Sequence, residues 1–215
     1  MRGAGINLKR FQSVLLLAAL GALAVGGAHG QQLTVELDFN QTTVAWTLGA
    51  TLHTVHGTFK AKSGKVQFDP TSGAASGMIV VDATSGESGN SSRDSNMHKA
   101  VIESRKYPEV TFTAQKVMGG FVAQGSSTVQ VQGVLRVHGA DHQLTIPVEL
   151  TGSGNDLGAK AHFDVPYVEW GMKDPSTFLL KVKKVVQIEI STVGHLEPAD
   201  RPRTISNMQI PGFPK

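Results

Sequence analysis

The sequence QLTIPVEL, residues 143–150, decides the fold class of this chain, because apolar and polar side chains alternate along its whole length. Its apolar positions are Leu144, Ile146, Val148 and Leu150. A period of two places these side chains on one face of a β-strand and the polar side chains on the other. The stretch therefore predicts a strand with one buried face and one solvent-exposed face.

The same alternation recurs on both sides of this stretch. It is found at residues 44–48, 55–59, 66–68, 78–80, 110–112, 134–137, 161–165 and 178–190. Turn signals separate the runs, such as Asp69-Pro70, SGK at 63–65 and HGADH at 138–142. The 24 glycines exceed what an all-helical chain would tolerate. We therefore expect an all-β, antiparallel protein.

The first thirty residues have the layout of a secretory signal. Arg2, Lys9 and Arg10 precede the apolar run FQSVLLLAALGALAVGG at 11–27, and the small residues Ala28 and Gly30 follow it. This order predicts a cleaved signal peptide and a periplasmic or secreted protein. An uncleaved membrane anchor is the alternative, because the run approaches the length of a membrane-spanning helix.

The composition removes several classes of function. The net charge of +3 belongs to the first thirty residues, which hold three basic and no acidic residues, so the remainder is formally neutral. A neutral chain gives no indication of a nucleic-acid partner. Cysteine is absent, which excludes disulfides, thiolate catalysis, cysteine zinc sites and a lipidated cysteine.

One segment interrupts the strands: SSRDSNMHKAVIESRKYPEVTF, residues 91–112. Asp94 or Ser95 can cap a short helix, and Met97, Val101 and Ile102 then share one face. Pro108 ends the segment. A short amphipathic helix between two strands of a small barrel would lie over an open end and cover apolar surface there. We expect these three apolar side chains to face the barrel mouth.

Five motifs, in order over residues 35–192, resemble the YceI-like family of secreted lipid- and polyisoprenoid-binding proteins. They are VELD, VHGTF with SGKVQFDP, SSRD with MH and KYPEVTF, VQGVLRVHG, and YVEWGMKD. The resemblance implies an extended eight-stranded antiparallel barrel, similar to lipocalins, with one short helix covering an end. It also implies an elongated apolar pocket for a long-chain lipid or an isoprenoid, quinone-like ligand. No cofactor is implied.

Two positions depart from the family pattern. Family members usually carry histidine where Gln41 stands and arginine where Tyr167 stands. These departures leave the head-group preference of the ligand open. With the resemblance, the chain divides into a signal peptide at 1–30, a YceI-like β-barrel domain at 31–194 and a proline-rich, flexible tail at 195–215. The tail can alternatively serve as a docking segment, because it contains four apolar side chains: Ile205, Met208, Ile210 and Phe213.

The candidate pocket residues are the large apolar side chains in strand phase and those of the covering helix. They are Trp46, Leu48, Phe59, Met97, Val101, Ile102, Phe112, Phe163, Trp170 and Ile188. An eight-stranded barrel is wide enough either to be filled by such side chains or to hold one ligand. Lys184 falls in phase with the inward residues, and it either neutralises a head group inside or is turned outward by a bulge.

Neither metal binding nor catalysis has a strong signal. His53 and His56 fall on opposite faces of a strand, and His138 and His142 flank a turn, where we expect solvated side chains rather than metal ligands. His98 on the expected helix faces either the barrel mouth or water, and we expect water. The chain lacks a Gly-x-Ser-x-Gly elbow. We interpret Arg93-Asp94 as a helix-entry cap and tether rather than a catalytic charge pair.

Three hypotheses follow for the function. The first is an exported barrel that carries a long apolar molecule, and it is the one that the family resemblance favours. The second is a filled barrel that acts as an envelope interaction protein, and the third is an enzyme acting on a lipid. We expect a binding protein and not an enzyme. Exposed strand edges also allow a homodimer.

Overall fold

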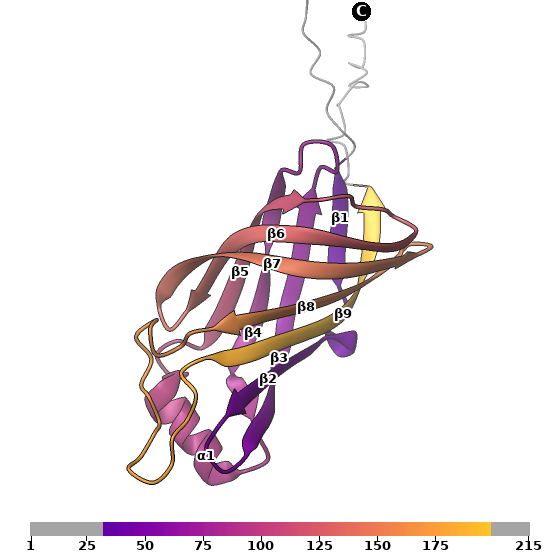
Figure 1. The fold of residues 1–215 in the computed structure, drawn as a ribbon. Coiled ribbons are helices and arrows are strands. Elements are labelled where there is room, and N and C mark those ends of the chain that lie inside the picture. Colours follow the sequence, from indigo (N-terminus) through magenta and orange to yellow (C-terminus); the bar gives the residue numbers. More distant parts are fainter. Residues whose placement is uncertain (1–31, 199–215) are drawn as a thin grey trace, which may run out of the picture.

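The computed structural model of the chain describes residues 32–198 (Figure 1). The expected signal peptide and residues 199–215 of the expected tail lie outside the described residues. Within residues 32–198, no helix is both long enough and apolar enough to cross a membrane.

The described residues form nine antiparallel strands in one closed sheet. They are β1 (Leu33–Leu37), β2 (Thr43–Gly49), β3 (Thr54–Phe68), β4 (Ala75–Glu87), β5 (Glu109–Met118), β6 (Gly125–Val137), β7 (Ala140–Ser153), β8 (Asp156–Val165) and β9 (Val186–Pro198). Neighbours in sequence pair from β2 to β9, and the pairing of β2 with β9 closes the ring. The predicted eight-stranded antiparallel barrel is confirmed.

Nine strands make an eight-stranded barrel because β1 and β2 occupy one strand position between β3 and β9. The short 3-10 turn η1 (Phe39–Gln41) separates them. Asp38 caps this turn by accepting hydrogen bonds from Gln41 Nε2 at 2.7 Å and from the Asn40 backbone N–H at 2.9 Å. These two bonds favour the carboxylate, so they lower the pKa of Asp38. Gln41 thus serves to hold the bend between β1 and β2.

The alternation at residues 143–150 is confirmed, since Ile146 and Leu150 are buried in β7, Leu144 and Val148 are half-buried, and the residues that alternate with them are exposed. Two boundaries differ from the sequence prediction. Residues 178–185 form a connection and not a strand, because β9 begins only at Val186. At its other end β9 continues past residue 194, where Leu196 pairs with Val35 of β1. Both ends of β9 depend on the strands that pair with it, β8 at its start and β1 at its end. The periodicity of the sequence does not show where such pairing begins or stops.

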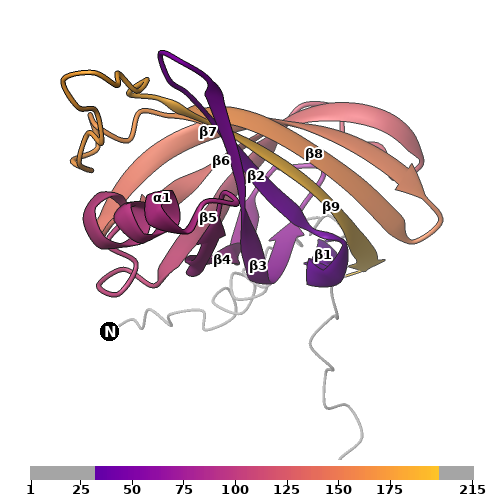
Figure 2. The same ribbon diagram turned by 90° about the horizontal axis from the view of Figure 1, so that it is seen from below.

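The segment between β4 and β5 is a short helix that lies across one end of the barrel (Figure 2). It comprises α1 (Ser91–Asn96) and a π-helical turn, η2 (Met97–Val101). The predicted cap was wrong: Asn90 is the N-cap, and its side chain accepts a hydrogen bond from the Arg93 backbone N–H at 3.0 Å. Asparagine caps as well as aspartate does, so the helix begins one turn earlier than predicted.

Candidate functional site

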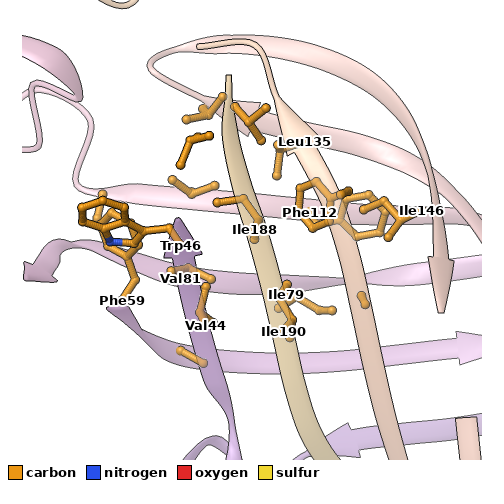
Figure 3. Close-up of a pocket in the computed structure, with 18 of the residues that line it drawn as sticks. Val44, Trp46, Phe59, Ile79, Val81, Phe112, Leu135, Ile146, Ile188 and Ile190 are labelled. Carbon is orange, nitrogen blue, oxygen red and sulfur yellow. The ribbon is translucent and has the colours of Figure 1, made fainter. Parts of the chain in front are cut away.

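The barrel is hollow. A cavity of about 760 Å³ runs through its interior and is lined by inward-facing side chains of the strands (Figure 3). Inward residues such as Phe59, Ile79 and Phe112 remain only partly buried, because one side of each faces this space. Val129, at 2% exposure, is the most deeply buried of the core side chains. A filled barrel would bury many large side chains to this extent.

An apolar cluster covers the end of the cavity opposite α1. Val35, Phe68, Val129, Leu150 and Leu157 form its buried part. The β5–β6 loop adds Phe121, whose ring packs edge-on against Phe68 with centroids 5.0 Å apart. Gln124 fastens the same loop to the β7–β8 turn: its Nε2 donates to Gly154 O at 2.8 Å, and its Oε1 accepts from the Gly154 N–H at 3.1 Å. This end therefore has a packed apolar wall.

Polar contacts hold the helical cover on the other end. His98 contacts Gly86 O through Nε2 at 2.8 Å and Ser104 Oγ through Nδ1 at 2.9 Å. A carbonyl only accepts, so Nε2 carries hydrogen. The expectation that His98 faces water was wrong. Its Nδ1 contacts Ser104, which follows the helix, and its Nε2 contacts Gly86 of β4. His138 adds a second contact, 2.7 Å from Nε2 to Glu103 Oε2, and is therefore not a solvated turn residue.

Arg93 and Asp94 join the cover to the end of β4. Arg93 donates from Nε to Ser88 Oγ at 2.7 Å and from Nη2 to Ser88 O at 2.9 Å. The Ser88 hydroxyl also bonds to the Asp94 carboxylate. The tether interpretation is confirmed, although the cap is Asn90. Arg93 also lines the cavity, in a group of polar residues at this end: His53, Asn90, Ser92, Arg93 and Asn96. Thr42 and Thr192 also line the cavity, and their hydroxyl groups bond to each other at 2.6 Å. The cavity is thus mostly apolar along its length, with a group of polar residues at the α1 end.

Nine of the ten candidate pocket residues line the cavity. They are Trp46, Leu48, Phe59, Met97, Val101, Ile102, Phe112, Phe163 and Ile188. Trp170 is not among the lining residues. It lies in the connection after β8, where strand phase has no meaning, and its ring stacks on His142 at 3.8 Å between centroids. Whether the nine contact a ligand stays a prediction.

Sequence reasoning missed many smaller wall residues. Figure 3 shows Val44, Ile79, Val81, Leu135, Ile146 and Ile190 around the same space. Val44, Leu135, Ile146 and Ile190 lie in phase with a candidate or buried residue on their own strands, so the alternation was a sufficient signal for these four. Residues 78–81 are all apolar, and the phase expected there was wrong, since Ile79 and Val81 line the cavity while Met78 is 47% exposed. Lys184 is exposed and lies in the connection before β9, so it points away from the interior.

Trp46 is the largest side chain of the wall and is 6% exposed. Its ring lies against the backbone of Gly57 on β3, where a Cβ atom would stand 2.2 Å from Trp46 Cζ2. Phe59 lies beside it (Figure 3). The indole Nε1 is buried and has no hydrogen-bond partner among the described residues.

Tyr167, at the position of the usual family arginine, is 4% exposed and packs beside the cavity near α1. Its hydroxyl donates to Lys183 O at 3.0 Å. Burial, followed by the negative charge of Asp174, raises the pKa of Tyr167 to about 12. Tyr167 therefore supplies a neutral hydrogen-bond donor that fixes the connection before β9, where an arginine would place a charge.

This burial predicts a loss of stability at high pH. Tyr167 keeps its proton in the folded state, so its favourable contribution is complete below the ordinary pKa of 10.0. It is lost as the pH rises towards about 12. Over that interval we expect the native protein to lose up to about 2 kcal/mol of unfolding free energy relative to Tyr167→Phe. Urea unfolding of both proteins at increasing pH measures this difference. Parallel pH profiles would contradict the assignment.

No group of three or more histidine, aspartate or glutamate side chains that could hold a metal ion occurs in residues 32–198. The histidines that were considered as ligands have other contacts: His56 bonds to Thr47 Oγ1 at 3.0 Å, and His142 stacks on Trp170.

The fold and the cavity define a lipocalin-like barrel with an apolar interior and one polar end. The family model described as the YceI-like domain matches residues 35–194. The chain therefore belongs to the YceI-like family, and the resemblance inferred from its motifs is confirmed.

Among curated proteins, a UPF0312 protein of Vibrio parahaemolyticus is 36% identical over 104 residues, covering 47% of this chain and 53% of the relative. The chain thus spans about half the length of the Vibrio relatives it matches. A UPF0312 protein of Yersinia enterocolitica is 27% identical over 169 residues, covering 72% of this chain and 81% of the relative.

Two solved structures share the fold at low identity. Burkholderia cenocepacia BcnA has a TM-score of 0.60 at 19% identity, covering 73% of this chain and 98% of that chain. A polyisoprenoid-binding domain from Saccharophagus degradans has a TM-score of 0.62 at 15% identity, covering 76% of this chain and 98% of that chain.

Proposed function

We propose that this protein is exported and binds a long-chain isoprenoid, or a similar amphiphile, in the barrel cavity. The observation that carries the proposal is the cavity of about 760 Å³ with apolar walls. This volume lies within the range of pockets that enclose whole ligands, about 300–1,000 Å³. Removing a hydrocarbon chain from water into such a space is favourable in proportion to the area buried.

The distribution of polar residues supports an orientation for the ligand. The head group lies at the α1 end, beside Arg93 and Asn96, and the tail extends towards Phe68 and Leu157. A quinone-like ring or a hydroxyl would find hydrogen-bond donors at the first end, and the packed apolar wall would receive the chain at the other. The polyisoprenoid-binding neighbour from Saccharophagus degradans supports the same class of ligand. Export rests on the layout of residues 1–30.

The two tryptophans provide a test with an internal control. Trp46 lines the cavity, whereas Trp170 stacks on His142 outside it. A ubiquinone with a long isoprenoid tail is the probe, because its ring quenches indole fluorescence on close approach. In Trp170→Phe, where Trp46 is the sole indole, we expect saturable quenching at one ligand per chain. In Trp46→Phe we expect little quenching.

The same experiment can refute the proposal. Quenching in Trp46→Phe without quenching in Trp170→Phe would place the quinone outside the cavity, and no quenching in either variant would contradict binding of the quinone. Mass spectrometry of an organic extract from the native protein then identifies the resident molecule. An extract without any stoichiometric lipid, together with absent quenching, would favour the envelope interaction hypothesis.

A further inference from the structure

Large apolar side chains are exposed on two loop tips at the α1 end of the barrel. Leu52, in the β2–β3 turn, is 80% exposed, and Phe178 and Leu179, in the β8–β9 connection, are 93% and 84% exposed. These are the three most exposed of the large apolar side chains in residues 32–198. We call them the apolar tips. Both loops project beyond the strands on the side of α1 (Figures 1 and 2).

The conformation of the β8–β9 connection presents its two apolar residues to solvent. The Thr177 N–H donates to Leu180 O at 2.8 Å, and the Leu180 N–H donates to Thr177 Oγ1 at 3.1 Å. Phe178 and Leu179 are therefore the central residues of a tight turn. Such positions usually hold glycine, proline, asparagine, aspartate or serine, so the turn itself does not require a Phe-Leu pair.

Backbone hydrogen bonds hold the two loops side by side. The Thr51 N–H donates to Lys181 O at 2.9 Å, and the Lys183 N–H donates to Gly49 O at 2.8 Å. Ala50 and Val182 form a β-bridge between these two bonds. The apolar tips thus belong to one connected structure. They also adjoin the cavity, because Ala50, Leu180 and Val182 line it.

Positive charge accompanies the apolar tips. Residues 173–185 contain four lysines and one acidic residue, Asp174. Lys181, Lys183 and Lys184 are exposed in the strip that follows the turn. Asp174 accepts a hydrogen bond from the Ser176 N–H at 2.8 Å. The hydrogen bonds from Ser176 and, after them, the charges of Lys184 and Lys181 lower the pKa of Asp174, so its carboxylate offsets one of the four lysine charges. The strip around the cavity end is therefore basic, whereas residues 32–198 together contain 14 lysines and arginines against 16 aspartates and glutamates.

We propose that this end of the barrel docks on an anionic phospholipid bilayer, with the apolar tips in the interfacial layer and the lysines on the head groups. Exposed aromatic and aliphatic side chains beside lysines are the combination that binds such interfaces. A second copy of this chain is a less suitable occupant, because it would bring two sets of lysines together. The docked orientation presents the polar end of the cavity to the membrane, so it extends the proposed function to ligand transfer.

The absence of cysteine from the sequence allows a site-specific test. Leu179→Cys carries an environment-sensitive fluorophore at the apolar tips. Phe39→Cys carries the same fluorophore at another exposed apolar site, 52% exposed, in η1 between β1 and β2 and away from the tips. Each full chain is titrated with vesicles of phosphatidylcholine alone and of phosphatidylcholine mixed with phosphatidylglycerol. The two variants differ only in the position of the fluorophore. A response at residue 179 alone therefore reports binding through the apolar tips and not through another segment of the chain.

We expect a blue shift at Leu179→Cys with the mixed vesicles, at a lipid concentration about tenfold or more below that needed with phosphatidylcholine alone. Phe39→Cys should not shift. Adding Lys181→Glu and Lys184→Glu to the Leu179→Cys chain should remove the preference for mixed vesicles. Equal responses at the two labelled sites, or an unchanged preference in the glutamate variant, would overturn the proposal.

A blue shift without vesicles that grows with protein concentration would identify a homodimer and would also overturn it. Failure of docking is distinguishable from failure of ligand binding. Quenching of Trp46 in detergent solution reports on the cavity without any membrane, whereas the label at residue 179 reports on the membrane without any cavity ligand.

Discussion

Ala161→Phe is expected to prevent the protein from retaining a long-chain ligand while leaving it folded. Ala161 lies on β8, pairs with Ile190 on β9 and Val148 on β7, and lines the cavity. A phenylalanine ring at this position extends into space that a ligand chain would occupy. We expect retention of co-purified lipid to fall at least about tenfold, because contact along the chain is lost.

The stability of the same variant tests whether the interior is hollow in solution. In a filled core an added ring of this size costs about 1–3 kcal/mol or more. In a cavity of about 760 Å³ the ring finds room, so the urea midpoint should stay near that of the native protein or rise. Ala45→Phe is the matched control, because Ala45 alternates with the inward residues Val44 and Trp46 and does not line the cavity.

Two outcomes would contradict this account. Wild-type lipid content in Ala161→Phe would show that the ligand lies elsewhere. A loss of stability of about 1 kcal/mol or more would show that the interior is packed in solution. The control should keep both its lipid and its midpoint.

Gly57→Ala is expected to give a large loss of stability, because the added methyl group would overlap both a side chain and a backbone atom of the barrel wall. The new Cβ would stand 2.2 Å from Trp46 Cζ2 and 2.3 Å from the backbone oxygen of Glu87. Moving the indole relieves only the first contact, because the second is with the backbone of β4 beside α1. We expect a loss of about 3 kcal/mol or more in the free energy of unfolding.

Gly120→Ala is the matched control for this substitution. Gly120 lies in the β5–β6 loop, and a Cβ added there would meet no atom within 4 Å. An alanine at such a position should change stability by less than about 1 kcal/mol. Urea unfolding compares the two variants, and failure of Gly57→Ala to fold at all agrees with the expectation. A Gly57→Ala midpoint equal to that of Gly120→Ala would refute the close packing of Trp46 on β3.

The alternation of side chains was sufficient to predict the strands and most of the wall. Trp46 and Ile188, for example, were assigned inward from phase alone, and they are directly paired across β2 and β9. Phase has no meaning outside a strand, so the same reasoning misplaced Trp170, which follows the end of β8 and packs on His142. It also extended β9 backwards into the turn that carries Phe178.

The hollow interior could not be predicted, because it depends on which side chains meet across the barrel. Five alanines from four strands face the cavity: Ala61, Ala83, Ala114, Ala159 and Ala161. Each is an ordinary strand residue in the sequence, and only the closed ring shows that they leave space between the larger side chains. The contacts that hold the helical cover could not be predicted for a similar reason. Glu103 and His138, for example, are distant in sequence and meet only across the barrel mouth.

The pairing of the first and last strands has a consequence for the order of synthesis and folding. Val35 pairs with Leu196 and Val44 with Ile190, so the ring closes only when the last strand has been made. Contacts between residues so distant in sequence slow folding, because a long loop must be closed before they form. A chain exported as we propose would therefore still be open when its leader reaches the translocation channel. Because the ring closes late, the chain would stay unfolded enough to pass through the channel, and the barrel would assemble on the far side of the membrane.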